Sequence, residues 1–333
     1  MQNKLLETYG PGVPSFLRPF LEAKALRRLR DVGMNCGVEY TSLPFFSSLP
    51  KSSRLSHSIG VALLSYRYSQ DKKAALSGLF HDIATPCFAH TIDFLKGDYK
   101  NQTKTEEGTA SLIASDETIR LGLSKEGLTL EEVSDYALYP VCDNPSPRLS
   151  TDRLEYTLRN IYLFGYANLD KISRFCADLS LNGNELGKDE LQFNTLDIAL
   201  DFAFLSLRTS AVYICKEDRF AMDELANTLR SLLSNSIIDE ADLMLEEDAL
   251  LSKIMADAAG RRLWSRYTRL IAVEKAEEGD PASRPVASKI RYIDPYVKGL
   301  GRVSELNDAY KESVDKLRKT DFGVALKGKY ADD

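Results

Sequence analysis

The three histidines constrain this chain more than any other feature, because all of them lie between positions 57 and 90 of its 333 residues. They occur as His57, as the pair His81-Asp82, and as His90, which precedes Asp93 by three positions. An isolated histidine is usually a core residue, but imidazoles interleaved with carboxylates in one stretch are typical of a metal or catalytic site. We therefore expect a fold that brings these short segments together.

Helical periodicity places the first two histidines on neighbouring helices. A helix is expected over residues 53–68, with His57 on its packed face. A second helix is expected over residues 72–82 and ends in the His81-Asp82 pair. Small residues one turn before that pair, among them Gly78, leave room for the first helix to approach, so that the imidazoles can converge.

Asp152 is a candidate for a fourth ligand, because it falls in the first turn of a helix expected over residues 152–164. Thr151 suits the N-cap of that helix, and a carboxylate at this position can point outward from the helix end. The same carboxylate could instead compensate the helix dipole, and the sequence leaves both roles open. The complete candidate ligand set is His57, His81, Asp82 and Asp152.

Two imidazoles and two carboxylates form a mixed nitrogen and oxygen ligand set. Such a set suits one divalent ion per chain, with manganese, iron, magnesium, zinc and nickel as candidates and water in the open positions. An ion of this kind lowers the pKa of its bound water and polarises a phosphoryl oxygen. Hydrolysis of a phosphate ester or phosphoanhydride is therefore the expected chemistry.

The spacing of these residues resembles the H…HD…D pattern of the HD superfamily of metal-dependent phosphohydrolases. Within that superfamily the chain is most similar to the deoxynucleoside triphosphate triphosphohydrolase branch, which includes the mammalian sterile-alpha-motif and HD-domain enzyme and bacterial dGTPases. The resemblance covers about residues 16–208. It is carried by three stretches, Arg54-Leu55-Ser56-His57-Ser58, Leu79-Phe80-His81-Asp82-Ile83 and Thr151-Asp152-Arg153-Leu154-Glu155-Tyr156.

The resemblance implies roles for five further residues. Arg54 resembles the arginine that binds the substrate phosphate, and Arg153 resembles the basic residue that follows the last metal ligand. Tyr156 resembles a contact to the substrate sugar. His90 and Asp93 resemble a phosphate-facing histidine and the acid beside it, so His90 is the candidate acid or base.

The chain departs from this branch at two histidines. The family pattern His-Asp-x-Gly-His-Gly-Pro-Phe-x-His has Thr85 at its middle histidine here, and the family's His-Glu-x-Gly appears as Thr105-Glu106-Glu107-Gly108. A threonine hydroxyl donates a hydrogen bond but does not exchange protons near neutral pH. We place Thr85 and Glu106 in the catalytic region and Thr105 on the substrate side, and we expect weak hydrolysis of ordinary deoxynucleoside triphosphates.

Helical patterns dominate the rest of the chain, so we expect a mainly α fold with an HD-domain helical core over residues 1–276. Short apolar pieces around Asn182-Gly183-Asn184 indicate a small β-hairpin. Further helices are expected over residues 16–32, 105–114, 129–138, 195–216, 222–233 and 248–274.

An acidic linker rich in Gly and Pro follows this core, at residues 277–281. Residues 277–333 are therefore expected to form a separate C-terminal α+β extension. Within it we expect a strand over residues 286–293 and a helix over residues 303–318.

Composition excludes several other classes of protein. A net charge of -6 argues against a dedicated nucleic-acid binder, whose affinity depends mainly on neutralising phosphates. The longest apolar runs are too short to span a bilayer, and the first residues lack the apolar segment of a secretory signal. We therefore expect no membrane association and a cytoplasmic location.

The sequence as a whole predicts a metal-dependent hydrolase that acts on a nucleotide or another phosphorylated small molecule. The alternative is a nucleotide-binding regulator that keeps the metal and phosphate contacts with little or no turnover. The resemblance also implies a homo-oligomer.

Overall fold

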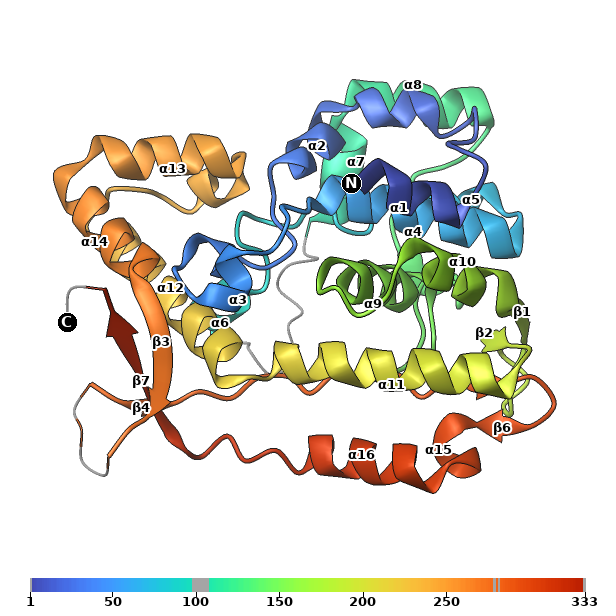
Figure 1. The fold of residues 1–333 in the computed structure, drawn as a ribbon. Helices are drawn as coiled ribbons and strands as arrows, with labels where there is room; N and C mark the ends of the chain where they lie inside the picture. Colours follow the sequence, from blue (N-terminus) through green and yellow to red (C-terminus); the bar gives the residue numbers. More distant parts are fainter. Residues whose placement is uncertain (1, 98–107, 278–279, 281, 332–333) are drawn as a thin grey trace.

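Helices dominate the architecture, and this confirms the mainly α fold expected from the sequence (Figure 1). The computed structural model describes residues 2–97, 108–277, 280 and 282–331. Within these residues one four-stranded and one three-stranded sheet accompany the helices.

Two consecutive buried helices form the centre of the fold. The first, α4 (Arg54–Ser69), begins after Ser53, whose hydroxyl accepts a hydrogen bond from the Ser56 amide. The second, α5 (Lys72–Phe80), begins after Asp71, whose carboxylate accepts a hydrogen bond from the Lys73 amide. Side-chain caps of this kind satisfy amides that have no partner inside a helix, so both helices start close to where the sequence predicts.

A third helix, α9 (Thr151–Leu163), packs across α4. Its N-cap is Ser150, whose hydroxyl accepts a hydrogen bond from the Arg153 amide, so the helix begins one residue before the expected position. Leu158 of α9 shares a buried hydrophobic cluster with residues of α4 and of α11 (Leu196–Tyr213). This common core fixes the first turn of α9 beside the first turns of α4.

The prediction of one helix over residues 16–32 is wrong. The structure has three short turns there, η1 (Arg18–Glu22), α2 (Lys24–Arg27) and η2 (Arg28–Arg30). Ala23 separates the first two with an extended conformation (φ -60°, ψ 131°), so the apolar residues of this stretch are buried by successive turns instead of one continuous helix.

The helix expected over residues 129–138 is also wrong, because only the 3-10 turn η4 (Tyr136–Leu138) forms there. The helices of this region are α7 (Thr109–Ser115) and α8 (Glu117–Glu126). The helix expected over residues 105–114 is therefore observed only from Thr109 onward, and positions 105–107 lie outside the described residues.

The remaining helical elements have the following bounds. They are α1 (Gln2–Tyr9), η3 (Val38–Tyr40), α3 (Pro44–Ser47), α6 (Thr91–Leu95), α10 (Leu169–Asp178), α12 (Lys216–Ser234), η5 (Ala241–Met244), α13 (Glu247–Ala256), α14 (Ala258–Thr268), α15 (Val303–Leu306) and α16 (Asp308–Arg318). Thus the helix expected at 303–318 is divided at Asn307 into two helices. The helix expected at 248–274 is divided at Asp257, and its last residues form a strand instead.

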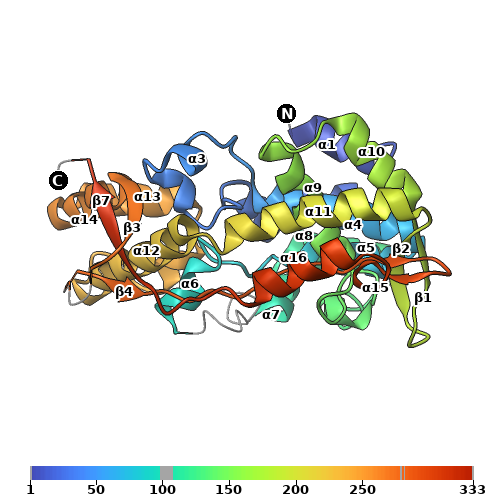
Figure 2. The same ribbon diagram turned by 60° about the horizontal axis from the view of Figure 1, so that its bottom comes forward.

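The expected hairpin is confirmed as β1 (Leu179–Gly183) and β2 (Asp189–Phe193), which pair antiparallel. The C-terminal part of the chain extends this sheet, because β5 (Tyr296–Val297) pairs parallel to β2 and antiparallel to β6 (Gly301–Arg302). Figure 2 shows α16 lying along α11 on the same side of the molecule. The sheet therefore joins the segment that contains β5 and β6 to the β1–β2 hairpin.

A second sheet joins β3 (Leu270–Lys275), β7 (Ala325–Tyr330) and β4 (Arg284–Pro285) in the order β3-β7-β4. The prediction of a strand over residues 286–293 is wrong, because these residues pair with no neighbouring strand in the described structure. The division of the chain into two units at residue 277 stays a prediction.

No individual helix among the described residues is long and apolar enough to cross a bilayer. The pair α11 and α12, bent by 43° where they meet, satisfies the length and composition criteria only when the two are taken together.

Gly60 of α4 provides a test of this packing. A Cβ atom at this position would lie 2.5 Å from Oε1 and 2.6 Å from Cγ of Glu155, which is fully buried on α9. Gly60→Ala gains about 1 kcal/mol of helix propensity, but we expect overpacking of about 1–3 kcal/mol to exceed that gain. The free energy of unfolding, measured by urea denaturation, should fall.

Gly10→Ala is the matched control, because nothing lies within 4 Å of a Cβ atom there. A Gly60→Ala protein as stable as this control would contradict the close approach of α4 and α9.

Candidate metal centre and active site

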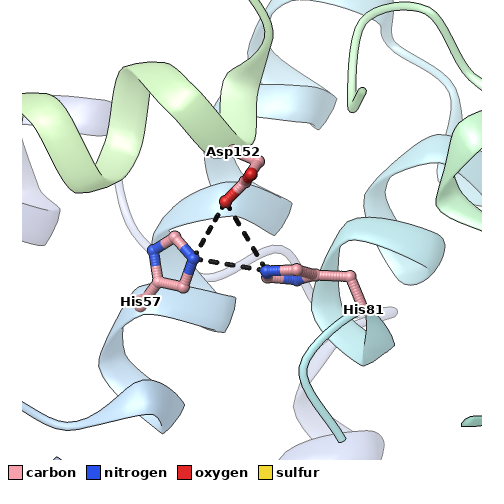
Figure 3. A group of neighbouring side chains, drawn as sticks. All are labelled: His57, His81 and Asp152. Atoms are coloured by element: carbon pink, nitrogen blue, oxygen red, sulfur yellow. Dashed lines mark hydrogen bonds and ion pairs between the residues drawn. The ribbon is translucent and has the colours of Figure 1, made fainter. Parts of the chain in front are cut away.

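Three side chains from three different elements converge on one point (Figure 3). Nε2 of His57 on α4 lies 3.2 Å from Nε2 of His81, the residue at the end of α5. Oδ1 of Asp152, in the first turn of α9, lies 3.1 Å from the first nitrogen and 3.7 Å from the second. Donor atoms about 2.1 Å from a shared ion lie roughly 3–3.5 Å apart, so these separations suit a divalent metal.

Asp82 lies at the edge of this group. Its Oδ2 atom is 3.9 Å from Nε2 of His57 and 3.6 Å from Nε2 of His81. Arg54 donates a hydrogen bond of 2.8 Å to the same oxygen, and the Thr85 hydroxyl donates one of 2.8 Å to Oδ1. Burial favours the neutral acid, but the charge of Arg54 outweighs it and holds the pKa of Asp82 well below its usual range. Asp82 is therefore an ionised carboxylate beside the two imidazoles.

Each histidine is oriented through its other ring nitrogen. Nδ1 of His57 donates to Oε2 of Glu155 over 2.6 Å, and Nδ1 of His81 donates to the Gly78 carbonyl over 2.7 Å. Such contacts fix the tautomer and direct Nε2 toward the centre, which is how metal-binding histidines are usually held.

Glu155 belongs to a buried ionic chain that the sequence analysis missed. Arg159, one turn further along α9, donates through Nε to Oε2 of Glu155 over 3.1 Å. Its remaining donors reach the Ser56 hydroxyl at 2.9 Å and the Ser56 carbonyl at 3.0 Å on α4. The sequence signal for this ionic chain was the spacing of Asp152, Glu155 and Arg159, which places all three side chains on one side of a helix.

The charges around His57 change its proton affinity. Burial alone would lower the pKa of His57, but its contacts with Asp152 and Glu155 raise it to about 9. The pKa of Asp152 is lowered to about 2, because its contacts with His57 and His81 outweigh the effect of burial. In the protein without metal, His57 is therefore an imidazolium between two carboxylates.

A cavity of about 370 Å³ opens onto this centre. That volume is in the range of small-molecule sites. Eight of the residues predicted from the sequence line it, namely Arg54, His57, His81, Asp82, His90, Asp152, Arg153 and Tyr156. Thr85 is buried behind Asp82, and Asp93 is buried behind His90. Thr105 and Glu106 lie outside the described residues.

Arg54 and Arg153, the two arginines predicted for the site, differ in their contacts. Arg54 is buried, and within the described part of the chain its Nε atom has no hydrogen-bond partner. Arg153, in the first turn of α9, donates hydrogen bonds to the preceding loop, at Asp143 Oδ1 over 2.9 Å and at Asn144 Oδ1 over 2.9 Å. Arg153 therefore stabilises the loop that leads into α9, even though its side chain also reaches the cavity.

His90 lies on the cavity wall and contacts Oδ2 of Asp93 through Nδ1 over 2.9 Å. Burial lowers the pKa of His90, and the charges of Arg291 and Arg54 lower it further despite the contact with Asp93. Its Nε2 atom is thus the ring nitrogen left for a ligand in the cavity.

Other parts of the cavity wall come from segments that the sequence did not indicate. These lining residues are Phe46, Tyr213, Asp218, Ser288, Lys289 and Arg291. They belong to distant elements, and no motif or spacing connects them to the histidines. Only the folded chain brings them together.

No family model matches this chain. It is 25% identical over 284 residues to the uncharacterized protein YdhJ of Bacillus subtilis, with 84% of each chain covered. It is 24% identical over 306 residues to a protein of Cordyceps militaris named metal-dependent phosphohydrolase cns2, with 87% of this chain and 83% of that protein covered.

The fold also has a counterpart among solved structures. A hypothetical protein from Aquifex aeolicus matches 96% of this chain and 92% of its own, with a TM-score of 0.61 and 17% identity. That likeness establishes the shared fold alone. These comparisons do not support the deoxynucleoside triphosphate triphosphohydrolase branch that the sequence resembles.

Glu155 can be tested by Glu155→Gln, which keeps the shape of the side chain and removes its charge. We expect the affinity for a divalent metal to fall by about 10–100-fold, because the orientation and basicity of His57 depend on this carboxylate. Metal titration calorimetry would measure it. Glu117→Gln, at an exposed position on α8, is the control and should bind metal like the unmodified protein. Equal affinities in the two variants would exclude the positioning role.

The raised pKa of His57 predicts a pH dependence of the metal-free protein. The folded-state pKa of about 9 exceeds the ordinary value of 6.5, so protonated His57 stabilises the fold fully below pH 6.5. That contribution is lost as the pH rises through about 9. The free energy of unfolding, measured by urea denaturation after chelation, should therefore decrease over this range. His57→Gln should lack the decrease, and an identical pH profile in both proteins would refute the assignment.

Proposed function

We propose that this chain is a metal-dependent phosphohydrolase of the HD superfamily that acts on a nucleotide or another phosphorylated small molecule. The observation that carries the proposal is the convergence of His57, His81 and Asp152, with Asp82 at their edge, on a cavity of small-molecule size. The similarity to a protein named metal-dependent phosphohydrolase supports the same class.

His57, His81, Asp82 and Asp152 would hold one divalent ion. When bound, such an ion supplies a water of lowered pKa and polarises a phosphoryl oxygen. Thr85 and Arg54 keep the Asp82 carboxylate ionised and turned toward the histidines. In this arrangement Thr85 acts as a positioning residue, although the family pattern has a histidine at its place.

Arg54 and His90 are the chain's own groups for the phosphate. Arg54 lines the cavity beside the metal centre, and its guanidinium would contact a phosphoryl oxygen there. A bound phosphate is negatively charged, so it would raise the pKa of His90 and favour a proton at Nε2. Asp93 holds the ring from the opposite side, and this proton can then pass to the leaving oxygen.

The proposal is tested by metal content and by turnover. Purified protein should carry about one divalent ion per chain and hydrolyse at least one member of a panel of nucleoside mono-, di- and triphosphates and simple phosphate esters. His81→Ala should lose both the ion and the activity, because one of the converging ligand atoms is gone. Elemental analysis and phosphate release measure the two quantities.

Lys125→Ala serves as the control on the same panel, because Lys125 lies on α8, away from the cavity wall. If the metal-loaded protein binds nucleotides without turnover, the proposal of a hydrolase is wrong and the alternative from the sequence, a nucleotide-binding regulator, takes its place. Normal metal content in His81→Ala would refute the site itself.

A further inference from the structure

One side of α9 follows the cavity away from the metal centre. Every fourth residue from the first turn of this helix to its C-cap lines the cavity, namely Asp152, Tyr156, Asn160 and Phe164. Residues four apart lie on one side of a helix, one turn after another. At 1.5 Å per residue, Asn160 lies about 12 Å and Phe164 about 18 Å along the helix from Asp152. The cavity therefore extends beyond the room that a phosphate at the metal centre would take.

The cavity wall away from the metal centre is rich in aromatic rings. Phe164 and Phe46 line it, and each packs against the ring of Phe45, with centroid separations of 5.2 Å and 5.1 Å. Tyr213, at the end of α11, lines it beside Tyr156, with a centroid separation of 6.3 Å. Tyr156, Phe164 and Tyr213 are partly exposed and belong to none of the hydrophobic clusters of the described residues. These three rings do not serve the core, so they are available to a ligand in the cavity.

A side-chain amide lies among these rings. The helices α9 and α11 lie side by side (Figure 1), and Nδ2 of Asn160 donates a hydrogen bond of 2.6 Å to the Tyr213 hydroxyl. This contact fixes the orientation of the amide. The side-chain oxygen of Asn160 accepts no hydrogen bond from the part of the chain that the structure describes, although buried amide oxygens are normally paired. It is therefore an acceptor for a ligand that carries an N–H group.

We propose that Phe46, Asn160, Phe164 and Tyr213 form a binding site for a planar ring of the substrate, here named the ring site. The ring is a nitrogen heterocycle with an N–H group at its edge, so the substrate is a phosphorylated compound of the nucleotide type and not a simple aliphatic phosphate. This inference rests on the proposed function, which assigns the phosphate to the metal centre. Aromatic side chains hold such rings by stacking. A ring without the N–H group would leave the Asn160 oxygen unpaired and is disfavoured for that reason.

Binding of non-hydrolysable phosphonates tests the ring site without requiring turnover. The metal-loaded protein would be titrated calorimetrically with the phosphonomethoxyethyl derivatives of adenine, guanine, cytosine and benzene. Ethoxymethylphosphonate, which has the same phosphonate arm and no ring, is the reference. At least one base derivative should bind tenfold or more tightly than this reference, which is about 1.4 kcal/mol. The benzene derivative should fall between the two, because it can stack but has no N–H group for Asn160.

Two variants separate stacking from hydrogen bonding. Asn160→Ala should bind the base derivatives no more tightly than the benzene derivative, because the acceptor is gone. Phe164→Ala should weaken the binding of every ring derivative by about fivefold or more, as is typical when one stacking partner is lost. Both variants should keep their affinity for ethoxymethylphosphonate within about twofold, which also shows that they are folded.

Asn235→Ala and Phe204→Ala are the matched controls, because both residues are exposed and neither lines the cavity. Each control should bind the whole series like the unmodified protein.

Two results would overturn the ring site. One is equal affinity of the unmodified protein for every ring derivative and for ethoxymethylphosphonate, and the other is a ring preference that persists in both Asn160→Ala and Phe164→Ala. A series in which no member binds would contradict the ring site and the phosphate site together. Failure of the proposed function alone looks different, because the ring preference would then be present while no phosphate compound on the panel is hydrolysed.

Discussion

The buried ionic chain from Arg159 through Glu155 to His57 is the interaction on which the site depends. An ion pair at full burial is costly unless its remaining donors and acceptors find partners. Here Arg159 meets that condition with Ser56, and Glu155 meets it with the imidazole. Gly60 lets α9 come close enough to α4 for these contacts to form. The packing of α9 against α4 and the orientation of His57, a proposed metal ligand, therefore depend on each other.

The parts of the site that depend on local sequence could be predicted. The start of α4 follows from Ser53, and the position of His81-Asp82 follows from the length of α5, because caps and periodicity act within a few residues. Asp152 was predicted for the same reason, although the cap is Ser150 and not Thr151. The four proposed ligands lie together in the structure, but their binding of metal stays a prediction.

The parts that depend on tertiary contacts could not be predicted. Residues 16–32 have helical periodicity, yet Ala23 is extended and the apolar residues are buried by short turns. Residues 286–293 have the composition of a strand but pair with no strand among the described residues. Lys289 and Arg291 line the cavity, and nothing near them in the sequence indicates it.

The charges of the site indicate how metal and proton can exchange. Asp82, Asp152 and Glu155 bring three negative charges, and Arg54 and Arg159 bring two positive ones. A proton on His57 neutralises the remainder, which accounts for its raised pKa. With a divalent ion held by these residues in place of the proton, the centre would have one net positive charge. By this count a phosphate anion is attracted more strongly in the metal-loaded state than to the neutral metal-free centre, so that metal and substrate binding would reinforce each other.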